Sequence, residues 1–309
     1  MSVRLIIPSP RIVTNNLNLT HKCWRPVTTL WLLVLSLSTG CLLAQSVANK
    51  DILCVMSYNL RFASPTGPNA WPQRRPLMRE CIQSVSPDII GTQEGLYPQL
   101  KDLAADLPEY SWIGLGREGG SKGEFMAVFY RKSRLDPLAF DHFWLSDTPN
   151  VVASSTWGNS NRRMVTWIRF LDRQSKREFY LFNTHFDHEI QAAREKSAEL
   201  VRRRIEELQT SLPIVMTGDF NAGADNKAHE ILTGDGFFSD TWTLAKERRG
   251  EGLGTFNGFK AVPENNTRID WILARGKVAV DIEQIITFSR DGRFPSDHCP
   301  LVAWLRLRE

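Results

Sequence analysis

Short apolar runs that each meet a polar cluster constrain this chain more than any other feature. They occupy residues 52–61, 89–94, 180–185, 214–221, 268–272 and 296–301. Apolar runs of this length, bounded by Gly, Pro, Asn or Asp, are typical of β-strands. A polar side chain at a strand end is held rigidly with its head group free. Several such side chains from one sheet edge can therefore converge on a single pocket.

Further strand-like runs and two helical patterns predict the fold class. Residues 125–130, 164–170 and 301–305 also read as strands, while residues 74–85 and 189–209 place apolar side chains on one helical face. No repeat, low-complexity linker or composition break interrupts the chain after Asp51. We therefore predict an α/β (α+β) fold in which two packed sheets are flanked by helices, and one domain over residues 51–309.

The N-terminal segment predicts export. Residues 1–44 hold four basic residues and no Asp or Glu, and residues 27–37 form an apolar run. This run is shorter than the roughly 20 residues of a spanning helix, so the pattern favours a signal sequence. Residues 37–41 resemble a bacterial lipobox that would lipidate Cys41, and cleavage after Ala44 or an uncleaved anchor are the alternatives. The expected location is periplasmic, membrane-anchored as a lipoprotein, or secreted.

Charge and cysteine content narrow the functional classes. Outside residues 1–44 the chain has 34 basic and 34 acidic residues. This balance excludes a broad positive field, so nucleic-acid binding would need a local patch. Three cysteines remain there, Cys54, Cys81 and Cys299, and we expect all three to be buried, small apolar residues.

The polar clusters contain groups suited to metal and phosphate chemistry. Glu94 and Asp297, with Asn59, are hard oxygen ligands that suit Mg²⁺ or Mn²⁺. His298 and Asp270 can form an imidazole–carboxylate pair. Each residue alone has a structural explanation: Asp and Asn form turns at strand exits, Glu94 could start a helix, and an isolated His185 is more often structural. The recurrence of such clusters favours a catalytic site.

The polar clusters form six sequence motifs: SYNLR (57–61), IIGTQE (89–94), FNTHFDH (182–188), TGDFNA (217–222), RIDWI (268–272) and PSDHCPL (295–301). With these motifs the sequence resembles the endonuclease/exonuclease/phosphatase superfamily, within a poorly characterised bacterial branch. They follow the family's order and cover about residues 51–306. The resemblance implies a deoxyribonuclease I-like fold, a four-layer sandwich of two sheets between helices.

The resemblance also implies roles for the motif residues. Glu94 would be the main metal ligand, with Asn59 beside it and Asp297 supporting a second position. Asp219 would orient or deprotonate the attacking water, and Asn221 would hold Asp219 and the phosphate in register. His185 and His298 would donate hydrogen bonds to the phosphoryl oxygens. Asp270 would orient His298.

Several weaker candidates concern substrate binding. Arg162 and Arg163, at the start of a strand, and Arg61 are predicted to contact the substrate. The tryptophans and arginine Trp71, Arg74 and Trp157 are candidates for the rim of the site. Residues 114–119 match a dinucleotide-binding glycine pattern, but no helix pattern follows, so we interpret them as a loop near the pocket.

These observations favour an exported, Mg²⁺- or Mn²⁺-dependent phosphoesterase. Its substrate would be a phosphodiester or phosphomonoester, such as a lipid headgroup, a nucleotide or nucleic acid, attacked in line by water. Membrane anchoring would come from the N-terminal segment, and the sequence indicates no protein partner. A secreted nuclease is the first alternative, and a non-catalytic binding module with the same fold is a distant second.

Overall fold

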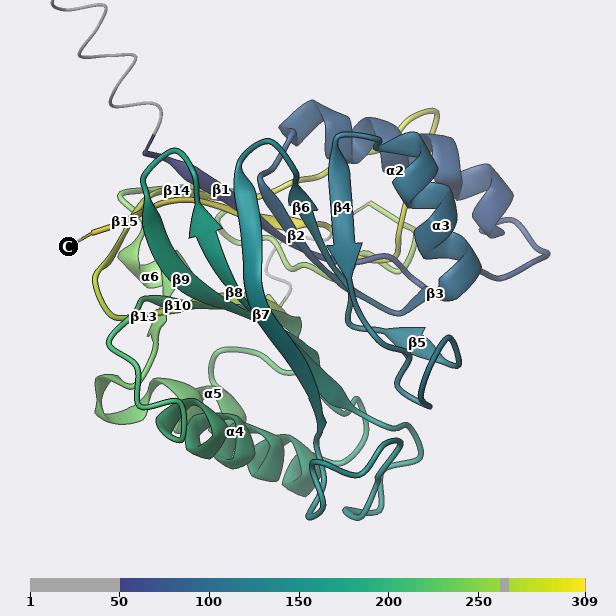
Figure 1. Cartoon of the computed structure of the whole chain (residues 1–309). Helices are drawn as coiled ribbons and strands as arrows, with labels where there is room; N and C mark the ends of the chain where they lie inside the picture. The colour runs from purple at the N-terminus through teal and green to yellow at the C-terminus, as the bar shows by residue number, and fades with distance from the viewer. Residues whose placement is uncertain (1–50, 262–266, 309) are drawn as a thin grey trace, which may run out of the picture. The chain divides into compact units, whose positions relative to one another are not determined.

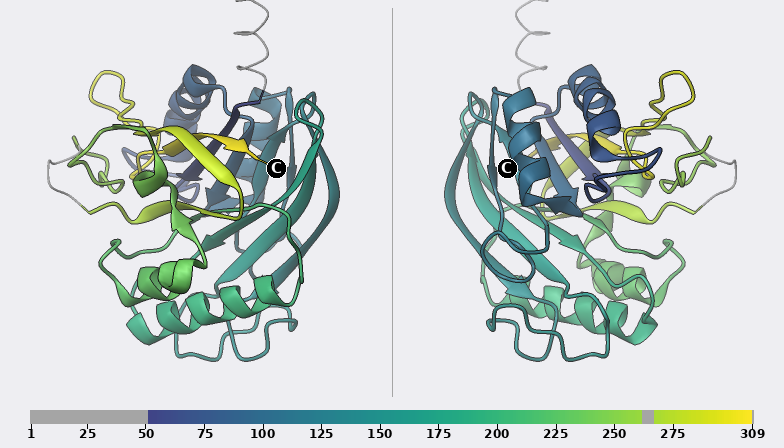
Figure 2. Two further views of the ribbon diagram at one scale, coloured as in Figure 1. Left: turned by 90° about the vertical axis from the view of Figure 1, so that its left-hand side faces the viewer. Right: turned by 90° about the vertical axis from the view of Figure 1, so that its right-hand side faces the viewer.

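The computed structural model describes residues 51–261 and 267–308. The predictions for residues 1–44 lie outside this part of the chain. Within it, two β-sheets pack face to face, with helices against their outer surfaces (Figure 1). The side views in Figure 2 show the same layers. The predicted arrangement of two sheets between helices is confirmed.

The first sheet has mixed strand directions. Its order is β12 (Glu247–Arg249), β14 (Val278–Ile285), β15 (Leu301–Leu307), β1 (Leu53–Asn59), β2 (Ile89–Gln93), β6 (Val128–Arg131) and β4 (Tyr110–Ile113). Strands β1 and β2 are parallel, whereas β15 runs antiparallel to β1. The C-terminal end of β1 therefore lies beside that of β2 and beside the start of β15.

The second sheet repeats this arrangement. Its order is β11 (Ser239–Asp240), β13 (Asp270–Arg275), β10 (Ile214–Asp219), β9 (Arg177–His185), β8 (Met164–Asp172) and β7 (Leu135–Trp144). Strands β9 and β10 are parallel, and β13 is antiparallel to β10. The strands β3 (Gly95–Leu96) and β5 (Glu124–Phe125) form a separate pair, and β3 begins directly after Glu94.

Helices cover the outer faces of both sheets. The described helices are α2 (Trp71–Val85), α3 (Tyr97–Asp106), α4 (Gln191–Glu206), α5 (Lys227–Thr233), α6 (Thr241–Leu244) and the 3₁₀ turn η1 (Gly234–Gly236). Of these, the short α6 packs against the core between the sheets rather than on an outer face. Helices α2 and α3 lie on the first sheet, and α4 and α5 lie on the second (Figure 1). None of the helices in the described residues is long and apolar enough to span a membrane.

Three of the four apolar clusters in the described residues hold these layers together. One lies between the sheets and includes Val55, Ile89, Leu181 and Val215. The second packs α4 and α5 on the second sheet, and the third packs α2 and α3 on the first. The three cysteines of this part of the chain are free and buried, as predicted.

The sequence located most of the strands in the sheet centres but missed others. The predicted run 125–130 divides into β5 and β6, because Phe125 pairs with Gly95 whereas Val128 pairs with Gly91. Strands β7 and β14 were not predicted. Each contains a bulge that breaks the apolar alternation, and β7 also contains a proline. The two predicted helices are present, at Trp71–Val85 and Gln191–Glu206.

Arg74 stabilises the loop that follows β1 through hydrogen bonds to its backbone. Its side chain is 2% exposed, and its guanidinium donates five hydrogen bonds to backbone carbonyls, those of Leu60, Arg61, Phe62, Asn69 and Pro295. The expectation that Arg74 lies on the substrate rim is therefore wrong. Trp71 is likewise buried and donates to Asp102, and Trp157 donates to Asp147.

We predict that Arg74→Met lowers the free energy of unfolding by about 3–5 kcal/mol, because it leaves several buried carbonyls without donors. Arg75→Met is the matched control. Arg75 makes partly exposed ion pairs with Asp102 and Asp106, so its loss should cost about 1 kcal/mol or less. Urea unfolding of both variants measures the difference, and equal losses would contradict this role for Arg74.

Strand β14 buries a carboxylate outside the cavity described below. Glu283 is fully buried. Burial raises the pKa of Glu283 to about 8, although the nearby positive charge of Arg268 acts in the opposite direction. Between pH 4.5 and 8 the folded chain therefore keeps a proton that the unfolded chain loses. Stability contributed by this group falls as pH rises through that range.

We predict that Glu283→Gln weakens the loss of stability between pH 5 and pH 9. At high pH the folded wild-type chain either ionises the buried Glu283 or keeps a proton that the unfolded chain has lost, and both lower the free energy of unfolding. Gln has no proton to lose, so this contribution disappears. Urea unfolding at both pH values gives the measurement. Exposed Glu109→Gln serves as the control, and an unchanged pH dependence in Glu283→Gln would refute the expectation.

Candidate active site

Strand register brings the predicted polar residues to one end of both sheets. Asp219 on β10 is paired with His185 on β9 and with Asp270 on β13. In the first sheet, Asn59 on β1 is paired with Gln93, the residue before Glu94. These strand ends border a cavity of about 490 Å³. Its lining includes the predicted residues Arg61, Glu94, Arg163, His185, Asp219, Asn221, Asp297 and His298.

Asn59 connects the two sheets at this cavity. Its Nδ2 donates to Glu94 Oε1 at 3.0 Å and to Asp219 Oδ2 at 2.9 Å. Its Oδ1 accepts a hydrogen bond from the backbone N–H of Arg61. Asn59 thus turns its amide N–H groups, rather than its oxygen, toward the carboxylates. This orientation reduces the repulsion between two like charges.

Glu94 is connected through Arg61 to a second carboxylate, that of Asp297. Its Oε2 accepts from the backbone N–H of Phe62 and lies 3.7 Å from Arg61 Nη1. Arg61 Nε in turn lies 3.6 Å from Asp297 Oδ2. Arg61 therefore supplies positive charge between Glu94 and Asp297. The alternative that Glu94 starts a helix is wrong, because α3 begins at Tyr97.

Three residues of this region have left-handed backbone conformations. The φ angles are 52° for Arg61, 63° for Glu94 and 51° for Asn221. Residues other than glycine adopt this region rarely, and the cost is about 1–3 kcal/mol each. At each of these three residues the left-handed conformation turns the backbone away from the direction of the preceding strand, directly at the cavity.

His298 is paired with two carboxylates. Its Nδ1 lies 2.9 Å from Asp270 Oδ2, and its Nε2 lies 3.6 Å from Asp219 Oδ2. Burial alone would lower the pKa of His298, but the charges of Asp270 and Asp219 outweigh it and raise this pKa to about 10. Burial and the charge of Asp270 raise the pKa of Asp219 to about 7. His298 is therefore a cation at neutral pH.

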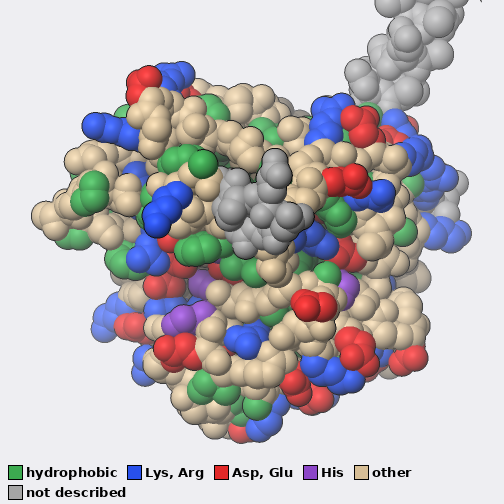
Figure 3. Space-filling model, turned by 180° about the vertical axis from the view of Figure 1, so that it is seen from behind, with side chains coloured by type: hydrophobic (Ala, Val, Ile, Leu, Met, Phe, Trp, Pro, Cys, Tyr) green, Lys and Arg blue, Asp and Glu red, His purple; other side chains and the backbone are tan. Residues whose placement is uncertain are grey.

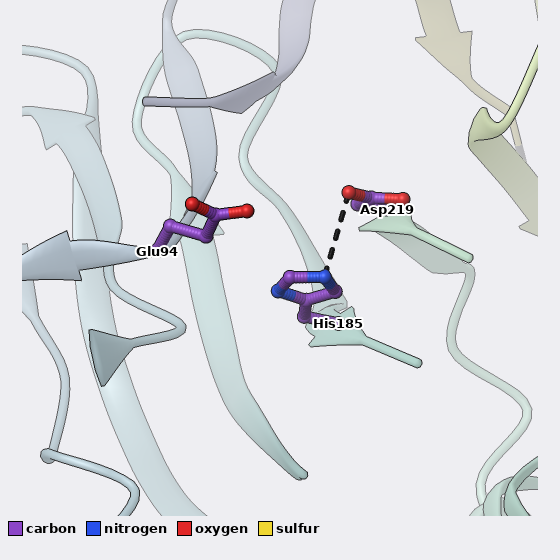
Figure 4. A group of neighbouring side chains, drawn as sticks. All are labelled: Glu94, His185 and Asp219. Atoms are coloured by element: carbon purple, nitrogen blue, oxygen red, sulfur yellow. Dashed lines mark ion pairs between the residues drawn. The ribbon is translucent and has the colours of Figure 1, made fainter. Parts of the chain in front are cut away.

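His185 has the opposite charge state. Asn221 Nδ2 donates to the carbonyl of Phe186, which fixes the amide orientation, and the same nitrogen lies 2.9 Å from His185 Nε2. His185 Nε2 is therefore an acceptor, and the proton resides on Nδ1. Burial, followed by the charge of Arg163, holds the pKa of His185 well below its usual value. The neutral imidazole lies between Glu94 and Asp219 (Figure 4).

Asn221 also fixes Asp219 through its backbone. The N–H of Asn221 donates to Asp219 Oδ1 at 3.0 Å. The structure thus places Asn221 against both Asp219 and His185. His185 Nδ1 is buried and has no hydrogen-bond partner among the described residues.

The side chains of Arg162 and Arg163, just before β8, have different surroundings. Arg163 is buried, lines the cavity, and lies 3.0 Å from His188 Nδ1 and 3.5 Å from Asp187 Oδ2. Arg162 is exposed and donates to the carbonyl of Ala153. Arg162 is not part of the cavity lining, so its prediction as a phosphate contact is wrong, because adjacent residues entering a strand point in opposite directions.

Sequence reasoning missed part of the cavity lining. Arg117, Glu124, Asn161, His188 and Phe256 line it without having been predicted. Arg117 lies within residues 114–119, and Glu124 begins β5 directly after the same loop. The loop glycines Gly119, Gly120 and Gly123 have positive φ angles. The interpretation of this segment as a loop near the pocket is confirmed. The THFDH motif was the available signal for His188, whereas Asn161 and Phe256 lie in loops without a pattern.

The donor set fits a divalent cation. Ligand atoms of Glu94, His185 and Asp219 lie within 4.8 Å of one another, and so do those of Asp219, Asp270 and His298. Carboxylate oxygens suit Mg²⁺ or Mn²⁺. Because His298 in the second group is protonated, the first group fits a cation better. Asp297 reaches this region through Arg61 rather than through a direct contact with Glu94.

Comparisons with known proteins agree with this geometry. A family protein from Bacteroides thetaiotaomicron is 35% identical, with a TM-score of 0.80 over 84% of this chain and 98% of that chain. A mannosyl-6-phosphatase from the same organism is 36% identical, with a TM-score of 0.77 over 82% and 99%. The uncharacterized protein L388 of Acanthamoeba polyphaga mimivirus is 30% identical over 49% of this chain. This match spans 59% of that relative's length.

A family model supports the same relationship over most of the described chain. The model of the endonuclease/exonuclease/phosphatase family matches residues 56–298. This span begins within β1 and ends at His298, so it contains all six motifs or most of each. The chain therefore belongs to the endonuclease/exonuclease/phosphatase family, whose members are usually hydrolases acting on phosphoesters.

Proposed function

We propose that the chain is an exported, divalent-metal-dependent phosphoesterase that cleaves its substrate by in-line attack of water. The observation that carries the proposal is the arrangement around Asp219. A cationic His298 and a neutral His185 both lie within 3.6 Å of Asp219 Oδ2. The Asp219 carboxylate, whose pKa is raised to about 7, therefore lies between the cationic donor His298 and the unprotonated Nε2 of a neutral His185.

These groups have distinct roles in phosphoryl transfer. His298 Nε2 donates a charge-assisted hydrogen bond to a non-bridging oxygen, where negative charge accumulates in the transition state. Asp270 keeps His298 protonated and oriented. Asp219 accepts a proton from the attacking water, for which a pKa near 7 is suitable. His185 stays neutral and therefore adds no second positive charge beside Asp219.

Charge balance supports the need for a cation. Three arginines and four carboxylates line the cavity: Arg61, Arg117, Arg163, Glu94, Glu124, Asp219 and Asp297. With His298 protonated, these charges balance, so the lining alone has no net attraction for a phosphate. Figure 3 shows a face on which histidine side chains lie among acidic and basic ones. A cation held by Glu94 would supply the missing positive charge and polarise the phosphoryl oxygen.

A phosphomonoester is the favoured substrate class. The mannosyl-6-phosphatase relative, at 36% identity, supports it, and so does the neutral charge of residues 45–309. A nuclease is the second candidate, supported by a fold shared with a zebrafish protein complexed with single-stranded DNA. Assays on sugar phosphates, sphingomyelin, plasmid DNA and RNA separate these substrates. Export rests on the pattern of residues 1–44, and fractionation of cells producing the full chain tests it.

We predict that Asp219→Ala and His298→Ala each lower turnover of a phosphoester by at least about 10²–10³-fold. The loss follows from removing the proton acceptor or the cationic donor, and the fold should persist. Steady-state kinetics with circular dichroism provide the measurement. His142→Ala, on β7, is the control. Near wild-type turnover in either site variant would refute these roles.

We predict that EDTA abolishes the activity and that Mg²⁺ or Mn²⁺ restores it. Calorimetric titration of the EDTA-treated chain should show binding of Mn²⁺, and Glu94→Gln should weaken this binding by at least about tenfold, because it removes a charged ligand. Exposed Glu109→Gln should bind as the wild type does. Full activity in EDTA would contradict the metal requirement, and equal Mn²⁺ affinities would contradict the role of Glu94.

A further inference from the structure

One wall of the cavity contains charged groups that the proposed chemistry does not use. Arg117 Nη1 donates to Glu124 Oε2 at 2.6 Å, and Arg117 Nη2 donates to Asn161 Oδ1 at 3.0 Å. All three residues line the cavity. Side chains of Arg117 and Glu124 are only 11% and 16% exposed. The hydrogen bond from Arg117 uses only the Oε2 oxygen of Glu124.

This wall is rigidly attached to the catalytic region. Strand β5, which carries Glu124, pairs with β3, and β3 begins at the residue after Glu94. The backbone N–H of Arg117 donates to the carbonyl of Glu124, and Trp144 Nε1 donates to the carbonyl of Arg117. The positions of Arg117 and Glu124 are therefore fixed relative to Glu94 before any ligand binds.

We propose that Arg117, Glu124 and Asn161 form a subsite that binds the hydroxyl groups of a polyhydroxylated leaving group, such as a sugar ring, on the phosphoester. This inference rests on the proposed phosphoesterase function and assigns the part of the substrate beyond the phosphate. A carboxylate oxygen accepts from sugar hydroxyls. The amide of Asn161 and the guanidinium of Arg117 donate to their oxygens.

Charge argues for hydroxyl groups rather than a second phosphate at this subsite. Glu124 and Arg117 neutralise each other at 2.6 Å, and Arg163 lies 3.5 Å from the carboxylate of Asp187. A flanking phosphate of a nucleic acid would meet the Glu124 carboxylate without a surplus positive charge. A cavity of about 490 Å³ is in the range that accommodates a small organic ligand, and is larger than a phosphate group needs.

Binding to an inactive variant tests the subsite without requiring turnover. In Asp219→Asn with Mg²⁺, calorimetry compares mannose 6-phosphate and glucose 6-phosphate with phenyl phosphate and inorganic phosphate. At least one hexose phosphate should bind about tenfold more tightly than phenyl phosphate, which lacks hydroxyls. Adding Glu124→Gln should reduce this preference by about tenfold or more. Adding Glu247→Gln, in an exposed pair with Arg249, should leave it unchanged.

The outcomes distinguish the two proposals. If neither hexose phosphate binds more tightly than phenyl phosphate, or if Glu124→Gln weakens all four ligands equally, the hydroxyl subsite is wrong. Kinetics on the wild-type chain decide the function separately. A chain that binds hexose phosphate through Glu124 but hydrolyses no phosphoester would refute the phosphoesterase and retain the subsite. In an active enzyme, Glu124→Gln should lower the ratio of kcat/KM for hexose phosphate to that for phenyl phosphate.

Discussion

The rest of the site depends on how two carboxylates from different sheets, the partly buried Glu94 and the buried Asp219, are held close together. Glu94 follows β2 in the first sheet, and Asp219 ends β10 in the second. The amide of Asn59 donates to both, so one neutral side chain offsets repulsion that would otherwise separate the sheets at this end. Ser296 extends the connection, because its Oγ donates to the carbonyl of Asn59 and accepts from the backbone N–H of His298.

A buried polar layer beneath the site keeps these sheet ends in register. Asn183 accepts from Gln93 Nε2 and from Thr217 Oγ1, and it donates to the carbonyl of Thr92. Gly91 has no room for a side chain, because a Cβ there would lie 2.0 Å from Thr217 Oγ1. Hydrogen bonds in this layer are directional, so it fixes one alignment of the sheets where apolar contacts would tolerate sliding.

The sequence predicted the parts of the site that strands deliver. Asp219 and His185 follow buried runs, and parallel pairing of β9 and β10 then places them together. Parallel pairing of β1 and β2 does the same for Asn59 and Glu94. Local pattern carries no information about loops, whose positions depend on distant contacts. Arg162 and Arg163 are identical as residue types, and only the path of the chain into β8 decides which one reaches the cavity.

The left-handed backbone at Arg61, Glu94 and Asn221 has a consequence for how the chain responds to selection. Each position stores conformational strain that the surrounding packing must overcome, so part of the folding free energy is spent on arranging the site in advance. The site therefore has its geometry in the folded chain before any ligand binds. Selection for thermal tolerance alone should relax these three positions first, at the expense of that geometry.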